Sequence, residues 1–135
     1  MAKKKKTIAA LVNQAAELTQ KLVKLKAADE NGYCRCVTCG VVKHWKEMQG
    51  GHFISRTWTA TKLLEENINV QCGRCNGPLR GNMIQYTIYM IDMYGRDFVE
   101  ELQDMKGKTK KYSRPEILDI IDELKTRVNE YEANQ

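Results

Sequence analysis

Four cysteines form two Cys-x-x-Cys pairs, Cys36/Cys39 and Cys72/Cys75. Two residues between the members of a pair let both sulfurs reach one ion, and two pairs complete the tetrahedral ligand set of a structural zinc site. A redox dithiol would need only one pair beside a βαβ pattern, which this sequence lacks. We therefore predict that these four residues bind a structural Zn²⁺ on which folding of the middle of the chain depends. Cys34, the fifth cysteine, is predicted to be a spare thiol.

His52 lies between the two pairs, directly after Gly50 and Gly51, so a substrate can approach it closely. Hydrolysis of a phosphodiester requires a base that activates water and a divalent cation that neutralises charge on the phosphate. Imidazole titrates near neutral pH, and Asn76 follows the second pair, where a zinc site places it near His52. These residues favour a nuclease. His44, the other histidine, is interpreted as structural or as a surface residue.

The order of these residues resembles that of the HNH, or ββα-metal, nuclease family. In that family a His on the first strand, an Asn in the connecting segment and a His or Asn at the start of the helix form the site. The resemblance implies that His52 is the general base, that Asn67 orients the connecting loop, and that Asn76 is a ligand of a catalytic Mg²⁺ or Mn²⁺. The cysteine knuckles also resemble those of phage T4 endonuclease VII.

A more specific resemblance is to the NinG/Rap family of lambdoid phage recombination proteins. The shared motifs are C-x-x-C-G, G-H-F, E-x-N-I-x-x-Q-C-x-x-C-N, and G-N before a tyrosine-bearing helix, and they span residues 36–102. The resemblance implies a structure-specific endonuclease that cuts branched recombination intermediates such as Holliday junctions. Alternatives are a non-catalytic zinc-dependent DNA-binding accessory protein and an HNH nicking endonuclease that acts on linear duplex.

One position departs from the HNH pattern. Most HNH nucleases have Asp or Glu directly before the His as a metal ligand, where this chain has Gly51. We expect Glu65 to supply the missing oxygen, because it aligns with the Glu of the NinG-like motif, with Glu66 and Glu47 as alternatives. Otherwise the metal binds weakly or activity is lost, which would favour the non-catalytic DNA-binding protein.

The net charge of +5 is concentrated in a run at residues 3–6 and in a cluster at residues 106–114. Basic patches of this kind are typical of proteins that bind nucleic acid. We predict branched or double-stranded DNA as the partner. The predicted phosphate contacts are Arg56, Arg74, Arg80, Lys108, Lys110 and Lys111.

The chain contains no apolar run long enough to span a membrane and no signal-peptide pattern after the lysine run. Reduced cysteines in metal-ligand spacing are typical of the cytosol. We therefore expect no membrane contact and a cytoplasmic location, in the host cytoplasm for a phage-encoded protein.

Apolar residues recur at alternating steps of three and four in residues 7–28 and after Ser113, which predicts two helices with narrow apolar seams. Thr7 is the predicted N-cap of the first, with Gly32 as its left-handed cap, and Ser113 begins a capping box before the last. The two seams can pair within one chain or with a second copy, and we expect a homodimer through these helices. The seam residues are Ile8, Leu11, Ala15, Leu18, Leu22, Leu25, Ile117, Ile121, Leu124, Val128 and Tyr131.

Short strands are predicted at 41–42, 52–54 and 68–70, with a loop at 55–66. A mostly buried helix is predicted at 82–94 and a short helix at 96–105. The predicted fold is α+β, and the resemblance implies a small zinc-stapled ββα-metal core (HNH, treble-clef-like) flanked by terminal helices. We divide the chain into 1–32 (basic tail and N-terminal helix), 33–95 (HNH-like core) and 96–135 (C-terminal helices with the basic loop).

Overall fold

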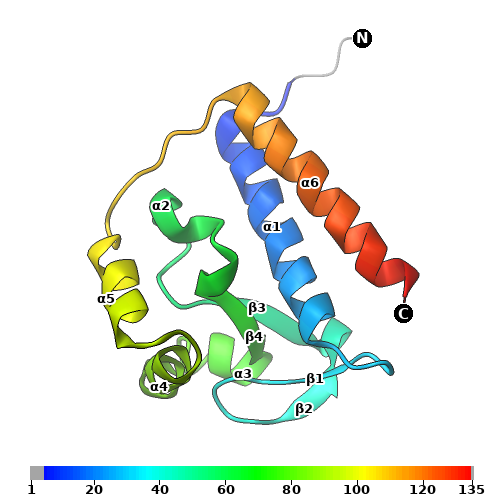
Figure 1. Ribbon diagram of the computed structural model, residues 1–135, viewed down its shortest axis with the longest axis vertical. Helices are drawn as coiled ribbons and strands as arrows, with labels where there is room; N and C mark the ends of the chain where they lie inside the picture. Colours follow the sequence, from blue (N-terminus) through cyan, green and yellow to red (C-terminus); the bar gives the residue numbers. More distant parts are fainter. Residues whose placement is uncertain (1–4, 135) are drawn as a thin grey trace.

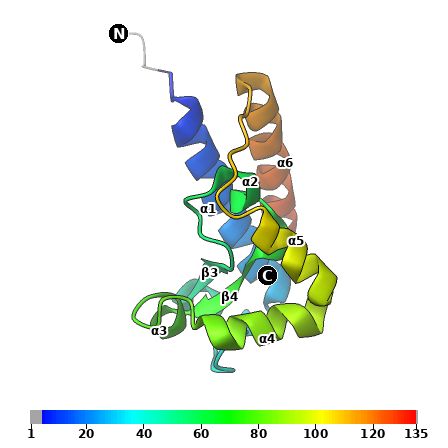
Figure 2. The same ribbon diagram turned by 90° about the vertical axis from the view of Figure 1, so that its left-hand side faces the viewer.

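The computed structural model describes residues 5–134, so Lys3 and Lys4 of the predicted basic run lie outside the described residues. Two small antiparallel hairpins form the sheets. The β3–β4 hairpin occupies the middle of the molecule, with α1 and α6 on one side and α4 and α5 on another (Figures 1 and 2), and the β1–β2 hairpin lies at the lower end in Figure 1. The elements are α1 Ile8–Ala27, β1 Tyr33–Arg35, β2 Val42–His44, η1 Trp45–Glu47, β3 Met48–His52, α2 Thr59–Lys62, η2 Glu65–Asn67, β4 Ile68–Cys72, α3 Gly73–Asn76, α4 Met83–Tyr94, α5 Arg96–Asp104 and α6 Arg114–Ala133.

The two terminal helices begin where the sequence predicts. Thr7 caps α1 by accepting a hydrogen bond from the backbone N–H of Ala10, and Ser113 caps α6 in the same way through Glu116. The expected cap at Gly32 is wrong, because α1 ends at Ala27. Gly32 instead adopts a φ of +87° in the turn that enters β1, where a Cβ atom would lie 2.8 Å from Cδ2 of His44.

The apolar seams of α1 and α6 pack against each other within one chain, and the helices lie side by side in both views (Figures 1 and 2). Their contact forms the largest apolar cluster, in which Leu22 and Ile117 are completely buried, while Ile8 at the start of α1 is 38% exposed. A homodimer through these helices remains a prediction, and it would have to use other faces because the seams already have partners.

The hairpin β3–β4 joins the cysteine knuckles to the segment around His52. Met48 pairs with Cys72 at one end of the ladder, and His52 pairs with Ile68 at the other. The strand predicted at 52–54 is therefore misplaced, since β3 ends at His52. The chain leaves the ladder because the backbone N–H of Ile54 bonds to the side chain of Asn67, at 2.8 Å.

Helix α1 crosses β3 at close range. A Cβ atom at Gly50 would lie 2.9 Å from the backbone Cα of Gln20, so only glycine fits beneath the helix. Gly50 therefore allows the close approach of two backbones. This contact joins the N-terminal helix directly to the hairpin that carries His52.

The segment expected as a loop at 55–66 contains the short helices α2 and η2. These elements have too few residues to show an apolar period, which explains why the sequence pattern does not reveal them. Within residues 5–134, none of the helices is both long enough and apolar enough to cross a membrane.

Helix α4 has the predicted bounds but is not mostly buried. Only Tyr86 and Met90 are buried, whereas Ile84 is 79% exposed and Ile88 is 50% exposed. The β3–β4 hairpin is too narrow to cover more than one face of the helix. The buried face packs with Phe53 and with α5 into a separate small cluster.

Candidate functional site

The four cysteines of the two Cys-x-x-Cys pairs converge at the end of the hairpin. Their sulfur atoms all lie within 4.8 Å of one another, and the sulfurs of Cys39 and Cys72 are 3.7 Å apart. Two sulfurs bound to one tetrahedral zinc, each about 2.3 Å from the ion, are separated by about 3.8 Å. The donor set and its spacing therefore fit a structural zinc ion, as predicted.

Local backbone geometry prepares both knuckles for this ion. Gly40 closes the first turn with a φ of +83°, and its N–H bonds to the carbonyl of Cys36 at 2.9 Å. In the second knuckle, Cys72 caps α3 and accepts a hydrogen bond from the N–H of Cys75.

Cys34 is buried beside the cluster but does not belong to the four-sulfur group. Burial raises the pKa of the Cys34 thiol, which favours its unreactive protonated form.

His52 stands at the end of β3, and its ring is held by the backbone of α2. The Nε2 atom lies 2.9 Å from the carbonyl oxygen of Lys62. Because a carbonyl can only accept, Nε2 carries the hydrogen and Nδ1 is the unprotonated nitrogen of the neutral ring. Burial lowers the pKa of His52, and the nearby charges of Arg56 and Lys62 act in the same direction. The geometry thus favours a neutral imidazole with one basic nitrogen.

His52 and Asn76 line the same cavity, which has a volume of about 300 Å³. Arg56 and Arg80 line it as well, whereas Arg74, the third predicted arginine, does not. No carboxylate belongs to the part of this lining that the structure describes. The cavity therefore combines the imidazole of His52 and the amides of Gln20 and Asn76 with two guanidinium groups, an arrangement suited to a phosphate group.

Asn67 is completely buried and connects the chain segments around this cavity. Its amide donates hydrogen bonds to the carbonyls of Ile54 and Thr61, and its carbonyl accepts from the N–H of Ile54. These bonds hold the residues after His52 against α2. Asn67 therefore acts on the loop and not on a ligand.

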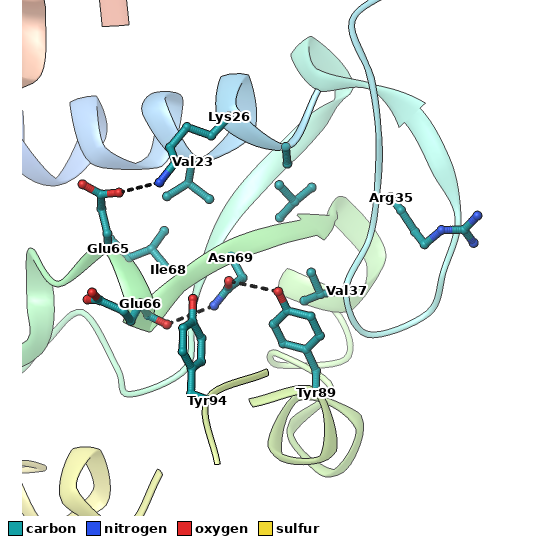
Figure 3. Close-up of a pocket in the computed structure, with 12 residues that line it drawn as sticks. Val23, Lys26, Arg35, Val37, Glu65, Glu66, Ile68, Asn69, Tyr89 and Tyr94 are labelled. Carbon is teal, nitrogen blue, oxygen red and sulfur yellow. Dashed lines mark hydrogen bonds and ion pairs between the residues drawn. The ribbon is translucent and has the colours of Figure 1, made fainter. Parts of the chain in front are cut away.

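Glu65 lies away from this cavity, contrary to the expectation that it replaces the missing carboxylate. It pairs with Arg127 of α6 and with Lys26 of α1, and Figure 3 shows its carboxylate turned toward Lys26. With Glu66 it lines a separate cavity of about 370 Å³, together with Tyr89 and Tyr94. Hydrogen bonding from Arg127 lowers the pKa of the Glu65 carboxyl, so this group is an ionised partner of two cations.

Glu47, the remaining alternative, is exposed in η1 and does not line the His52 cavity. The carboxylates proposed from the sequence are therefore all displaced from His52. For Glu65 the reason is the packing of the terminal helices, because α1 and α6 provide the cations that bind it.

The basic segment that precedes α6 is hydrogen-bonded to α2, the helix that ends at Lys62. The carbonyl of Lys108 accepts from the N–H of Ala60, and the N–H of Lys110 donates to Thr59. Lys110 and Lys111 line a neighbouring cavity of about 490 Å³, and Lys62 lines it too. Since the Lys62 carbonyl holds His52, the predicted lysine contacts are connected to the histidine through one residue of α2.

Sequence reasoning missed two glutamines of the β3–β4 hairpin, which pair with each other in the register of the strands. Gln49 accepts a hydrogen bond from the Asn76 amide at 2.7 Å, which turns the amide nitrogen away and leaves Oδ1 free. Gln71 is completely buried on β4 and donates to the carbonyl of Gly81 and to Thr38 of the first knuckle. The signal for Gln71 was its place in the Q-C-x-x-C-N motif, directly before Cys72.

A tyrosine of α4 supports the same strand. The hydroxyl of Tyr86 donates to the carbonyl of Gly51 at 2.6 Å, and the amide of Asn69 donates to that hydroxyl at 3.2 Å. Both groups are buried, so this short chain of hydrogen bonds restrains the backbone directly before His52.

These features define an α+β protein with a cluster of four cysteines that could hold a metal ion, and with an adjacent basic cavity. The family model of the bacteriophage lambda NinG protein matches residues 1–134. The chain therefore belongs to the NinG family, which confirms the resemblance seen in its motifs.

Individual relatives match about half of the chain. The ninG proteins of Escherichia phage 933W, Escherichia phage lambda and Salmonella phage P22 are each 32% identical over 71 residues, which is 50% of this chain. The matched region covers 34%, 33% and 34% of these proteins, so the chain spans about a third of the length of the curated relatives it matches. No solved structure gives a significant match.

Proposed function

We propose that this protein is a metal-dependent endonuclease that hydrolyses phosphodiester bonds in branched DNA, with an HNH-like site on the β3–β4 hairpin and α3. The observation that carries the proposal is the shared cavity, in which His52 and Asn76 meet beside Arg56 and Arg80. A histidine on a strand and an asparagine on the following helix match the order of the HNH family. The resemblance to recombination endonucleases supplies the branched substrate.

In the proposed reaction, Nδ1 of His52 takes a proton from a water molecule while the water oxygen forms a bond to phosphorus. The P–O bond to the leaving oxygen breaks, and that oxygen receives a proton from solvent. Arg56 and Arg80 hold the phosphate through charge-assisted hydrogen bonds. Oδ1 of Asn76 is the oxygen available to hold Mg²⁺ or Mn²⁺, because its amide nitrogen is bound to Gln49. When bound, the cation neutralises charge on the phosphate and leaving oxygen.

The donor set of the cavity fits a hard cation only in part. Asn76 provides a carbonyl oxygen, which is an accepted ligand for Mg²⁺, but the cavity offers no carboxylate among its described residues. Proteins that hold Mg²⁺ with few carboxylates complete the site with phosphate oxygens of the substrate. The DNA phosphate then contributes the negative charge that the protein lacks.

The test is cleavage of a four-way DNA junction by the zinc-loaded protein, with Mg²⁺ or Mn²⁺, in comparison with the His52→Ala variant. We expect metal-dependent cutting by the wild-type protein and a loss of at least a hundredfold in the variant. A linear duplex of matched sequence distinguishes branched-DNA cutting from nicking of linear DNA.

The absence of a carboxylate from the described lining of the cavity also favours a second candidate, a non-catalytic DNA-binding protein. In that case wild type and His52→Ala would bind the junction equally and leave it intact with either metal. Equal inertness of the two proteins with retained binding would therefore reject the enzyme and support the binding protein.

A further inference from the structure

The cavity of about 490 Å³ beside α2 combines apolar walls with a group of lysines. The lysines are Lys62, Lys110 and Lys111, and no acidic residue lines this cavity as far as the structure describes the chain. A ligand that matches this surface carries an apolar part together with negative charge. The other lining residues are Ile8, Ala9, Val12, Asn13, Thr59 and Tyr112.

The positive charge of the three lysines is not neutralised by the protein itself. None of the ion pairs formed by residues 5–134 includes any of them. The ammonium group of Lys62 donates a hydrogen bond to a neutral oxygen, Oδ1 of Asn13. Burial and the nearby charge of Arg56 lower the pKa of Lys62, and a bound anion would act in the opposite direction by favouring the charged form. The cavity is therefore suited to an anionic ligand.

Tyr112 provides an aromatic surface in this cavity. The ammonium group of Lys110 lies 4.8 Å from the centre of the Tyr112 ring, so a flexible side chain covers this face of the ring. A planar base can stack on such a ring whatever its identity, and a lysine displaced from the ring can bind a phosphate. Aromatic rings beside basic side chains are the arrangement by which proteins bind single-stranded nucleic acid.

We infer that this cavity binds one unpaired nucleotide of the DNA, with its base against Tyr112 and the apolar residues of α1 and its phosphates on the three lysines. The inference rests on the proposed function for the identity of the polyanion as DNA, and not on its cleavage. A volume of about 490 Å³ lies within the range of about 300–1,000 Å³ that is usual for sites of small organic ligands.

The cavity lies next to the proposed catalytic cavity. The carbonyl of Lys62 accepts the hydrogen bond from His52, whereas the side chain of Lys62 lines the nucleotide cavity. A strand bound at His52 can therefore continue into this second cavity. Bases are inaccessible along a regular duplex and become available where pairing is interrupted, so the cavity would favour such positions without reading their sequence.

The test compares two duplexes that each contain one unpaired nucleotide, which is a thymidine in one and an abasic nucleotide in the other. Both carry the same number of phosphates, so they differ only in the base. Their binding to the zinc-loaded full chain is measured by fluorescence anisotropy without added divalent cation. We expect wild type to bind the thymidine duplex at least tenfold more tightly. Equal affinity for the two duplexes overturns the inference.

Two neighbouring alanines of α1 provide matched variants. Ala9 and Ala10 are both exposed, but Ala9 lines the cavity and Ala10 does not. Ala9→Glu places a carboxylate in the cavity and should abolish the preference for thymidine. Ala10→Glu makes the same change in net charge and should retain the preference. Equal behaviour of the two variants overturns the inference, because it would indicate a diffuse basic surface.

A second measurement uses only the wild-type protein. With 5-iodouracil as the unpaired base, irradiation should cross-link the DNA to Tyr112, as identified by mass spectrometry. Cross-links confined to other aromatic residues overturn the inference. Displacement of the thymidine duplex by polyglutamate as readily as by an oligothymidylate of equal charge also overturns it, because the cavity would then be a site for acidic peptides.

These outcomes are distinct from those that test the proposed function. If the preference for thymidine follows the expected order but four-way junctions stay intact, only the endonuclease fails. If junctions are cut and the two duplexes bind equally, only the nucleotide cavity fails.

Discussion

The Nε2 atom of His52 donates a hydrogen bond to the backbone carbonyl of Lys62 over 2.9 Å, which joins the end of β3 to the end of α2. This bond fixes the ring orientation and leaves Nδ1 as the nitrogen that can accept a proton. The interaction uses the backbone of Lys62, so substitution of its side chain leaves it intact. The position of the ring therefore depends on the fold of α2, which Asn67 holds in place.

The first prediction concerns the pH dependence of DNA cleavage. The pKa of His52 is lowered chiefly by burial, so the ring stays neutral below its ordinary titration range near pH 6.5. A general base works in its neutral form, so the pH at which the cleavage rate is half-maximal should lie below 6.5. The measurement is the single-turnover rate on a four-way junction between pH 5 and 8. A half-maximal rate well above pH 6.5 would contradict it.

The same pKa shift predicts how His52 affects stability. Between the lowered folded pKa and the ordinary value near 6.5, the unfolded chain binds more protons than the folded chain. Stability from this group is therefore complete above about pH 6.5 and decreases as pH falls toward the folded pKa. The variant His52→Gln removes the titration, so its free energy of unfolding should depend less on pH between 5 and 7. Chemical denaturation at several pH values measures the difference.

The third prediction concerns metal removal and the role of the cysteines. Cys72→Ser should release the zinc and unfold the hairpin, because the small cluster around the knuckles has little other apolar support. Cys34→Ser is the matched control, since Cys34 is buried beside the same cluster but outside the sulfur group. It should keep one zinc per chain. Elemental analysis and circular dichroism measure both, and zinc loss in Cys34→Ser would show that the ligand set is different.

The long helices and the zinc ligands could be predicted from the sequence because local patterns determine them. A cap at Thr7, apolar steps along α1 and the spacing of Cys36 and Cys39 each depend on residues close in the chain. The partner of α1 could not be predicted in this way. An apolar seam indicates that a helix packs, but both an internal partner and a second copy satisfy it.

The environment of the site was predicted less well, because it depends on contacts between distant residues. The pairing of Glu65 with Arg127 joins residues 62 positions apart, and no local pattern indicates it. The contact between Gly51 and Gln71 is another such case, since it requires the register of β3 on β4. The exposure of α4 likewise depends on how much of the helix a narrow hairpin can cover. The position of His52 near Asn76 was predictable from the family motif, and its pairing with Lys62 was not.

The fourth prediction tests whether Glu65 is structural. Glu65→Gln should lower the free energy of unfolding by about 1 kcal/mol at pH 7, because it weakens a partly exposed pair with Arg127 and Lys26. The lowered pKa means that this contribution is present above the ordinary carboxyl pKa and is lost as pH falls through the folded value. Glu66→Gln is the control, since no ion pair of Glu66 occurs among the described residues. Loss of Mn²⁺ binding in Glu65→Gln would instead make Glu65 a ligand.

The last prediction concerns the two arginines of the cavity. Arg56 and Arg80 line it with His52, whereas Arg74 is exposed outside it. If each of the first two neutralises a phosphate, the double variant Arg56→Ala/Arg80→Ala should reduce the slope of log affinity against log salt concentration by about 2. Arg74→Ala should leave the slope nearly unchanged, although Arg74 carries the same charge and lies only six residues before Arg80. Junction binding measured at several salt concentrations gives both slopes, and equal effects of the three arginines would indicate a diffuse basic surface instead of a phosphate site.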